Sequence, residues 1–253
     1  MSPISASEKI PAPDEKEGYV LYLKDEKVSE VTGKEAGMVM PTAMARLGES
    51  FFVCDRDCIH VFTLKEKVSK ESEILFAPDD TALNDMVLAG DYLYVTVTNT
   101  DRVYRVNVKK TPYTPELLTK VPSPNGIDVR DGRAYIVSIP ADYATLKPEN
   151  LVYWIADVEN PAPEPLNATA RLYDGAALSA DGRTLYVSDW ISQAVIALDL
   201  NTGEEKTVYT REGLTPADIA VDGDTLWIPD LEHHQVIEFN TKCQKSPPSA
   251  RWR

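Results

Sequence analysis

A hairpin motif recurs along this chain, and its period constrains the fold more than any other feature of the sequence. Three copies open on related segments: Leu83-Asn84-Asp85-Met86, Pro124-Asn125-Gly126-Ile127 and Tyr173-Asp174-Gly175-Ala176. A short turn with Gly and a strand-like run containing Tyr follow each of them. Weaker copies begin at Thr42 and Ala217, so successive starts are separated by 42, 41, 49 and 43 residues. Hairpins at this spacing predict a β-propeller, in which each repeat forms one blade.

Each repeat continues with two further runs that are rich in β-branched and aromatic residues. The third runs span residues 58–62, 102–106, 151–155, 194–198 and 235–239, and the fourth runs span 73–76, 116–119, 170–173 and 206–209. Such runs, bounded by Gly, Pro, Asn and Asp, are typical of strands, and no segment sustains a helical period. Four strands make one propeller blade, so the sequence predicts an all-β propeller of five four-stranded blades.

The two ends of the chain bear on how the ring closes. The last repeat has no clear fourth run, whereas residues 19–23 and 27–31 form an additional hairpin-like pair near the N-terminus. We expect an N-terminal strand to complete the last blade, since this removes two open sheet edges. A six-bladed ring with a degenerate blade from residues 10–31 is the alternative. Residues 1–253 then form a single domain, with residues 1–16 and 241–253 as frayed tails.

Composition excludes several classes of protein. Lys and Arg number 26 against 40 Asp and Glu, a net charge of −14, with no basic stripe, so nucleic-acid binding is not expected. No apolar run approaches 18 residues, so no membrane span is expected. The polar first 16 residues do not resemble a signal peptide, which predicts a cytoplasmic protein or a mature secreted form. An acidic channel mouth would concentrate cations.

The chain has three cysteines, an odd number that argues against a disulfide framework. Cys54 and Cys58 flank a tight turn between two predicted strands, and we expect free thiols there, with a cross-turn disulfide as the alternative. A zinc site that adds His60 to these two cysteines is disfavoured, because strand residues alternate between the two faces of a sheet.

The position that varies among the three best repeats is the main candidate for a binding site. The innermost strand of each blade lines the central channel of a propeller, so Asn84, Asn125 and Asp174 are expected to converge near the axis. Amide and carboxylate oxygens suit a hard cation, above all Ca²⁺, whereas softer metals prefer His or Cys. Asn and Asp that merely form local turns with the backbone are the alternative.

Loops that open on the same face of the ring supply further candidates. The loop over residues 138–150 is long and carries Tyr143, and long loops over a site often act as lids. Trp190 lies in the corresponding loop of the fourth repeat. His233 and His234 lie in that of the fifth, where a neutral imidazole is able to act as a general base. Exposed loop histidines without a catalytic role are the alternative.

These motifs, in this order, resemble those of the senescence marker protein/gluconolactonase family, which includes regucalcin and the related diisopropylfluorophosphatases. The matching segments are Leu83-Asn84-Asp85, Ser123-Pro124-Asn125-Gly126 and Asp174-Gly175, and the resemblance covers residues 40–240. It implies that Asn84, Asn125 and Asp174 are divalent-metal ligands or bind the substrate. It also implies that Asp174 is the general base or nucleophile.

The chain departs from the family pattern in two respects. The family has a Glu before Gly-Pro in the first blade, whereas residues 38–42 contain no acid and place Thr42 in the ring. Asp85 and Asp218 lie one residue out of register with the expected ligands. Fewer charged ligands imply weaker calcium binding. The family is also six-bladed and longer.

Taken together, the sequence predicts a metal-dependent hydrolase of the lactonase or esterase type that acts on a small molecule. The cation would polarise a carbonyl group, and Asp174, His233 or His234 would activate water. The residues expected to contact the substrate are Asn84, Asn125, Thr42, Tyr143 and Trp190. Two alternatives stay open, because a fold alone does not fix a function. One is a metal-free propeller enzyme of secondary metabolism, similar to strictosidine synthase. The other is a non-catalytic binding scaffold.

Overall fold

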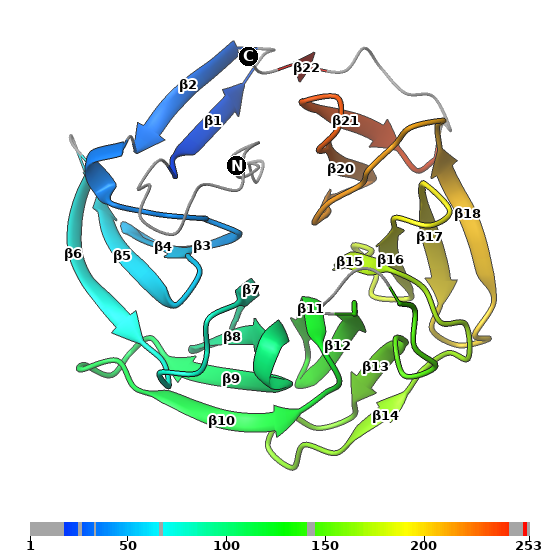
Figure 1. Ribbon diagram of the computed structural model, residues 1–253, viewed down its shortest axis with the longest axis horizontal. Coiled ribbons are helices and arrows are strands. Elements are labelled where there is room, and N and C mark those ends of the chain that lie inside the picture. Colours follow the sequence, from blue (N-terminus) through cyan, green and yellow to red (C-terminus); the bar gives the residue numbers. More distant parts are fainter. Residues whose placement is uncertain are drawn as a thin grey trace.

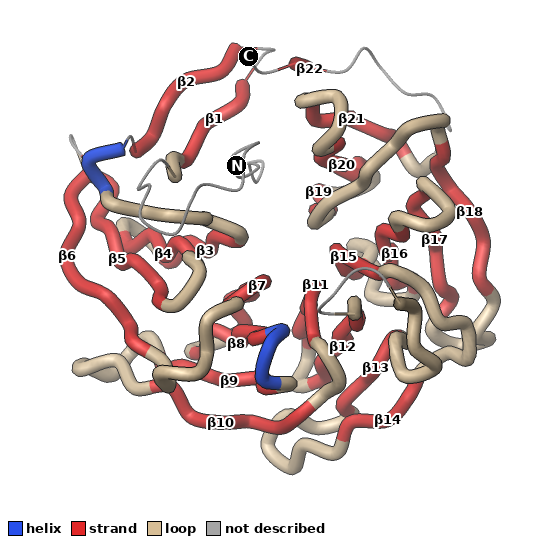
Figure 2. Tube along the Cα trace, in the orientation of Figure 1, coloured by secondary structure: helices blue, strands red, loops and turns tan. Residues whose placement is uncertain are grey.

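Five four-stranded antiparallel sheets are arranged in a ring around a central axis, and a two-stranded sheet stands beside them in the ring (Figure 1). This computed structural model describes residues 18–24, 27–32, 34–65, 68–140, 145–242 and 250–251. Within these residues Figure 2 shows helix at two places only, the 3-10 turns Lys34–Ala36 and Thr98–Thr100. No helix in the described ranges has the length and hydropathy needed to cross a membrane. The prediction of an all-β propeller with five four-stranded blades is confirmed.

We number the four-stranded sheets as blades 1 to 5, and in each the strands follow one another outward in chain order. Blade 1 comprises β3 (Ala43–Leu47), β4 (Ser50–Cys54), β5 (Cys58–Leu64) and β6 (Val68–Leu75). Blade 2 comprises β7 (Leu83–Ala89), β8 (Tyr92–Val97), β9 (Arg102–Asn107) and β10 (Pro115–Lys120). Blade 3 comprises β11 (Pro124–Arg130), β12 (Arg133–Ser138), β13 (Val152–Ile155) and β14 (Pro163–Pro165). Blade 4 comprises β15 (Tyr173–Leu178), β16 (Thr184–Asp189), β17 (Ala194–Asp199) and β18 (Glu205–Thr210). Blade 5 comprises β19 (Ala220–Asp222), β20 (Thr225–Asp230), β21 (Gln235–Asn240) and β22 (Ala250–Arg251).

The ring closes differently from the sequence prediction. The fourth strand of blade 5 is β22, from the C-terminal end of the chain, and it pairs antiparallel with β21. The prediction that an N-terminal strand completes this blade is therefore wrong. A nearby strand closes a shorter loop than one from the far end of the chain, which costs less conformational entropy.

The N-terminal hairpin pairs with itself instead. Its strands β1 (Val20–Lys24) and β2 (Lys27–Thr32) form a separate two-stranded sheet. Figure 1 shows this sheet in the ring between blade 1 and the end of blade 5. Val20 and Met38 are buried in one cluster with Phe51, Val53 and Phe62 of blade 1, so this part of the chain packs against the first blade.

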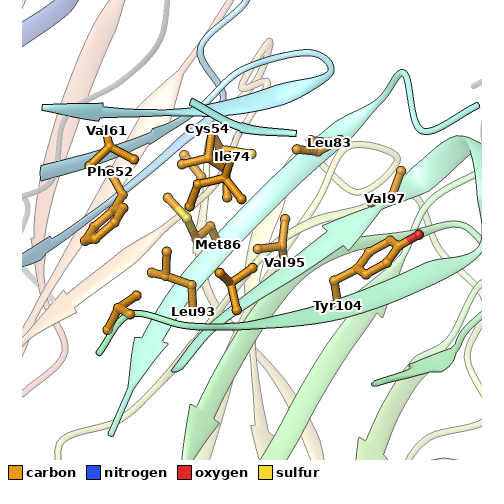
Figure 3. Close-up of a cluster of buried hydrophobic side chains, with 14 residues drawn as sticks. Phe52, Cys54, Val61, Ile74, Leu83, Met86, Leu93, Val95, Val97 and Tyr104 are labelled. Atoms are coloured by element: carbon orange, nitrogen blue, oxygen red, sulfur yellow. The ribbon is translucent and has the colours of Figure 1, made fainter. Parts of the chain in front are cut away.

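Apolar side chains fill the spaces between neighbouring blades. In Figure 3, Phe52 and Cys54 of blade 1 lie in one cluster with Met86 and Leu93 of blade 2, and all four side chains are buried. Similar clusters join blade 2 to blade 3, blade 3 to blade 4 and blade 4 to blade 5. Burying a large aliphatic side chain contributes roughly 1.5–3 kcal/mol, so these clusters hold the blades in fixed relative positions. Polar groups that project toward the axis are thereby held in place as well.

Candidate functional site: the bulged inner strands

The three repeated motifs form β-bulges at the start of the inner strands. Pairing shifts between Leu83 and Met86 in β7, between Pro124 and Ile127 in β11, and between Tyr173 and Ala176 in β15. In each case two residues face one residue of the second strand, which bends the chain and redirects side chains. The bulged pairs are Asn84-Asp85, Asn125-Gly126 and Asp174-Gly175. The expected position of Asn84, Asn125 and Asp174 at the start of three successive inner strands is thus confirmed.

Two glycines in the bulges allow the inner strands to approach closely. A Cβ atom at Gly126 would lie 2.5 Å from the carbonyl oxygen of Asp174, and one at Gly175 would lie 2.5 Å from the amide nitrogen of Ile219. At Gly175 the same atom would lie 2.8 Å from Oδ1 of Asp218. Asp218 therefore lies directly against the bulge that carries Asp174. Glycine is required here for space, since any side chain would collide with backbone.

Blade 2 has Asp85 where blades 3 and 4 have glycine, and this carboxylate joins two blades. The Met86 amide donates to Asp85 Oδ1 at 2.6 Å, and the Ile127 amide of blade 3 donates to Oδ2 at 2.7 Å. Asp128 repeats this arrangement one blade further, since its Oδ2 accepts from the Leu178 amide at 2.7 Å. Two carboxylates thus hold inner strands together by accepting backbone hydrogen bonds.

Two hydroxyl groups stabilise the bulges from the second strands. Thr96 Oγ1 accepts from the Asp85 amide at 3.0 Å and donates to the Asn125 carbonyl at 2.6 Å. Ser188 Oγ accepts from the Gly175 amide at 2.7 Å and donates to the Ala217 carbonyl at 2.9 Å. Both residues are fully buried and occupy the same position in their repeats. A hydroxyl residue at the same position of two repeats is a sequence signal that could have indicated this role.

Asp174 is a carboxylate whose pKa is raised into the neutral range. Burial raises its pKa to about 7, and repulsion from Asp85 contributes in the same direction. Hydrogen bonding with the side chains of Trp190 and Asn125 favours the charged form and limits the rise. The Trp190 indole NH also donates to the Pro216 carbonyl at 2.8 Å, which fixes the ring beside the carboxylate. The structure therefore brings Asp174, Asn125 and Trp190 together, as three of the predicted site residues.

Two further carboxylates next to Asp174 also have raised pKa values. Burial raises the pKa of Asp85 to about 6, with a smaller contribution from Asp128. Burial also raises the pKa of Asp218, as does repulsion from Asp85 and Asp174. We call Asp85, Asp174 and Asp218 the inner ring. The groups that shift Asp85 and Asp174 are carboxylates, backbone amides, Trp190 and Asn125, with no cationic side chain among them.

Blade 1 contributes to the same end of the channel in a different way. β3 pairs with β4 without a register shift, so this blade has no bulge. Thr42 precedes β3 and donates its hydroxyl to the Leu83 carbonyl of blade 2 at 3.4 Å. Asn84 is partly exposed on the neighbouring bulge. Thr42 therefore lies beside the chain that carries Asn84.

His233 and His234 lie in the turn between β20 and β21. The contacts of His233 in the structure are with residues outside the inner ring. Nδ1 of His233 lies 2.9 Å from Oδ2 of Asp230, at the end of β20, and Arg211 pairs with the same carboxylate oxygen. His234 is exposed, with a positive φ of 52°. The role of His233 or His234 as a general base stays a prediction. The contacts of His233 are with Asp230 and not with the inner ring.

The long loop of blade 3 is described at its two ends. Asn150 is buried; its Nδ2 donates to Ser138 Oγ at 3.3 Å, and its Oδ1 accepts from the Lys147 amide at 3.0 Å. These bonds fasten the loop to the end of β12. Tyr143, which was predicted to contact the substrate, lies outside the described residues.

The donor set of the channel suits a hard cation. The side chains of Asn84, Asn125 and Asp174 offer oxygen atoms, and no cationic side chain is among the groups that shift the pKa values of Asp85 and Asp174. Ca²⁺ binds such amide and carboxylate oxygens and completes its shell with water. Among the described residues, three His, Cys, Asp or Glu ligands within 4.8 Å of one another occur at Cys58, His60 and Glu73 only. A channel cation would therefore depend on the two Asn side chains.

Solved structures share the fold of this chain, although no protein-family model and no curated protein matches its sequence. A structure from a nidogen/laminin complex covers 94% of this chain and 91% of its own, with a TM-score of 0.74 and 15% identity. A protein from Bacteroides uniformis named as a 6-phosphogluconolactonase covers 96% and 79%, with a TM-score of 0.63 and 16% identity. A catalytically inactive virginiamycin B lyase from Staphylococcus aureus with quinupristin covers 84% and 70%, with a TM-score of 0.61 and 13% identity. At these identities the likeness shows the propeller fold alone.

Proposed function

We propose that this protein is a small-molecule hydrolase of the lactonase or esterase type, with its active site at the inner ring. The observation that carries the proposal is Asp174, a carboxylate in the channel whose pKa is raised to about 7 and which the side chains of Asn125 and Trp190 orient. A base that titrates near neutral pH combines a useful ionised fraction with a strong tendency to take up a proton. The resemblance to the gluconolactonase family and the fold shared with a protein named as a 6-phosphogluconolactonase support the same class.

The raised pKa values of two neighbouring carboxylates suggest separate roles for them. Ionised Asp174 takes a proton from a water molecule, whose oxygen forms a bond to the carbonyl carbon of the lactone. Asp218, whose pKa is raised by burial and by repulsion from Asp85 and Asp174, would act as the acid in its protonated form and give its proton to the ring oxygen as the C–O bond breaks. The proton on Asp174 then passes to Asp218, and the hydroxy acid leaves.

A divalent cation, with Ca²⁺ the best fit, belongs to this proposal. Asp174, Asn84 and Asn125 would hold it, and when bound it would supply positive charge to polarise the substrate carbonyl. Thr42 takes the place where the related family has Glu, so the site has one carboxylate fewer and we expect weak binding. We propose that Trp190 lines the substrate side of Asp174, with Tyr143 as a further contact.

Melting curves at two pH values test the cation. At pH 8 Asp174 is largely ionised, so added Ca²⁺ should raise the Tm by several degrees, and a chelator should reverse the rise. At pH 5 Asp174 is largely protonated, so the rise should be smaller. Asp174→Asn should abolish the rise at both pH values. Asp91→Asn, the same change on the exposed turn after β7, should retain it. Melting curves that do not respond to Ca²⁺ at pH 8 would contradict the cation.

Hydrolysis of a panel of lactones and esters tests the reaction. Asp174→Asn should lower kcat by about 10²–10⁴-fold with little change in Tm, because it removes a general base and keeps the shape of the side chain. Asp91→Asn is again the matched control and should hydrolyse at the wild-type rate. Full activity in Asp174→Asn would contradict the assignment of the base.

A metal-free enzyme is the second candidate, and the inner ring itself favours it. Neighbouring carboxylates with raised pKa values can act as acid and base without a cation. Activity that survives a chelator but is lost in Asp174→Asn supports this candidate over calcium-assisted hydrolysis. The fold shared with virginiamycin B lyase makes eliminations worth including in the substrate panel.

A binding scaffold is the remaining alternative, and one of the solved structures that share the fold comes from a protein complex. Inactivity of the wild-type protein on the whole panel, with and without Ca²⁺, supports this alternative.

A further inference from the structure

A second cluster of ligand-type side chains lies in blade 1, away from the inner ring. Cys58 and His60 are two residues apart on β5, so they project from the same face of the sheet. Glu73 pairs opposite His60 on the neighbouring strand β6. Cys54 pairs opposite Ile59 and therefore belongs to the other face, where Figure 3 shows it among apolar side chains. The strand register thus separates the two cysteines and selects Cys58, His60 and Glu73, which we call the blade-1 cluster.

The ligand atoms of the blade-1 cluster lie close together, with Cys58 and Glu73 against different nitrogens of the His60 ring. One ligand atom from each residue lies within 4.8 Å of the other two. Cys58 Sγ lies 3.6 Å from His60 Nε2, and Glu73 Oε1 lies 3.4 Å from His60 Nδ1. Neighbouring ligands of a tetrahedral Zn²⁺ ion are separated by about 3.3–3.6 Å, given metal–ligand bonds of about 2.0–2.3 Å. A shift of the Cys58 thiol toward Nδ1 would bring both partners to this nitrogen and leave Nε2 with Asp55.

His60 has a buried nitrogen without a hydrogen-bond partner. Its side chain is 3% exposed, and Nε2 lies 3.0 Å from Asp55 Oδ2. Asp55 also accepts the backbone amides of Val39, Met40 and Arg56, at 2.8, 2.6 and 2.9 Å, so its carboxylate is held in place. A proton on Nε2 satisfies Asp55 and leaves Nδ1 with a lone pair. This Nδ1 is buried and makes no hydrogen bond.

In this tautomer the lone pair on Nδ1 faces a carboxylate oxygen of Glu73 at 3.4 Å, and two acceptors at this distance repel each other unless a proton or a metal ion lies between them. Asp55 orients the imidazole by pairing with Nε2. Histidines that bind zinc commonly have such a carboxylate partner on the ring nitrogen that does not bind the metal. Oε1 of Glu73 lies 2.7 Å from Lys70 Nζ, and the Glu73 side chain is 41% exposed. Because this side chain reaches solvent, an ion can approach the cluster along it.

We propose that the blade-1 cluster binds one Zn²⁺ ion, with Cys58, His60 and Glu73 as ligands, a water molecule as the fourth, and Asp55 as the partner that orients His60. A set of one sulfur, one nitrogen and one oxygen suits zinc and not calcium, because hard cations avoid thiolates. On binding, the Cys58 thiol loses its proton to solvent and the thiolate takes the metal. The ion would fasten β5 to β6, which makes the site structural. It is independent of the chemistry proposed for the inner ring.

The alternative for the same atoms is a protonated imidazole between Asp55 and Glu73. This arrangement needs no metal and no contribution from Cys58. It therefore predicts no metal uptake and no thiolate ligand, and a spectroscopic probe of the sulfur separates the two.

Titration of the full-length chain with Co²⁺, in place of Zn²⁺, is the test. Cys243→Ser serves as the background, so that Cys54 and Cys58 are the remaining thiols. We expect a thiolate-to-cobalt charge-transfer band that saturates at one ion per chain and is displaced by Zn²⁺. Cys58→Ser should abolish the band. Cys54→Ser, which removes the thiol on the opposite face of the same hairpin, should retain it.

A second variant keeps the proposal falsifiable if Cys58→Ser does not fold. Glu73→Gln changes a partly exposed side chain and should weaken zinc binding at least tenfold. Zinc at about 100 times its Kd should raise the Tm of the background protein by roughly 5–10 °C, and by much less in Glu73→Gln. Absence of the band in the background protein, or a band that persists in Cys58→Ser, overturns the proposal.

Discussion

Two sets of aspartates lie at the same end of this propeller, and their partners distinguish them. The members of the inner ring lie at or just before the start of the inner strands: Asp85 in β7, Asp174 in β15, and Asp218 two residues before β19. A second set, which we call the outer ring, comprises Asp55, Asp189 and Asp230 and follows the second strands of blades 1, 4 and 5. All three are buried, with at most 2% exposure.

The outer ring is satisfied by donors and cations. Asp189 pairs with Arg171 at 3.2 Å and accepts the Ser192 hydroxyl at 2.5 Å. Burial would raise the pKa of Asp230, but hydrogen bonds from Gln235 and His233 outweigh it and hold the pKa below its usual value. The pKa of Asp55 is lowered in the same way, because hydrogen bonds from His60 and three backbone amides outweigh the effect of burial.

The inner ring has backbone amides and its own members as neighbours, and its pKa values rise. Burial of a carboxylate therefore does not mark a reactive group in this fold. What separates the two rings is whether hydrogen-bond donors and cations beside the carboxylate outweigh the cost of burying its charge. Three predictions test this distinction.

The largest effect is expected from loss of an outer-ring carboxylate. Asp189→Ala leaves Arg171 partly buried beside Glu205 alone and removes the ties to the following turn, so the free energy of unfolding should fall by about 3 kcal/mol. Asp218→Ala removes a repulsive group and should change it by less than about 1 kcal/mol. Urea denaturation of both variants provides the measurement. Equal losses in the two variants would remove the distinction between the rings.

A smaller effect is expected from filling the space at the inner bulges. In Gly175→Ala the new Cβ would meet the Ile219 amide at 2.5 Å, so the inner strands of blades 4 and 5 must separate. Overpacking of this kind costs about 1–3 kcal/mol, and the Tm should fall by several degrees. Gly126→Ala should act alike, because its Cβ would meet the Asp174 carbonyl at 2.5 Å. An unchanged Tm in both variants would show that the strands do not approach so closely in solution.

The fold followed from features that are local in the chain. Hairpin spacing, turn glycines and strand composition predicted the blades. The register within the repeats placed Asn84, Asn125 and Asp174 at the start of successive inner strands. Ring closure was not predictable in this way, because β22 is only two residues long and lies in a polar tail.

The site was predictable in part, since its remaining members depend on pairing between strands. Asp85 and Asp218 were placed one residue out of register, and only the bulges and the close approach at Gly175 bring them to Asp174. From the sequence, a zinc site made of Cys54, Cys58 and His60 was disfavoured. The alternation of side chains along a strand excludes Cys54, but Glu73 comes from the next strand, 13 residues after His60, and only the pairing register of β5 with β6 places it opposite His60.

The smallest expected effect is the pH dependence of stability, in which the two rings act with opposite sign. The pKa values of Asp55 and Asp230 are lowered by folding, so their contribution is present above the unfolded value of 3.8 and is lost as the pH falls through the folded pKa. The pKa of Asp174 is raised from 3.8 to about 7, so its contribution is present below 3.8 and is lost as the pH rises to about 7. Without added cation, stability should therefore be greatest between these limits, near pH 4–5. Between pH 5 and pH 8 the free energy of unfolding should fall by roughly 1 kcal/mol once partial exposure of Asp174 is taken into account.

Asp174→Asn should flatten this part of the profile and leave the acid limb unchanged, as measured by urea denaturation in a chelator. A fall that is just as steep in Asp174→Asn would assign it to other groups, and the inner ring would then be as well compensated as the outer one.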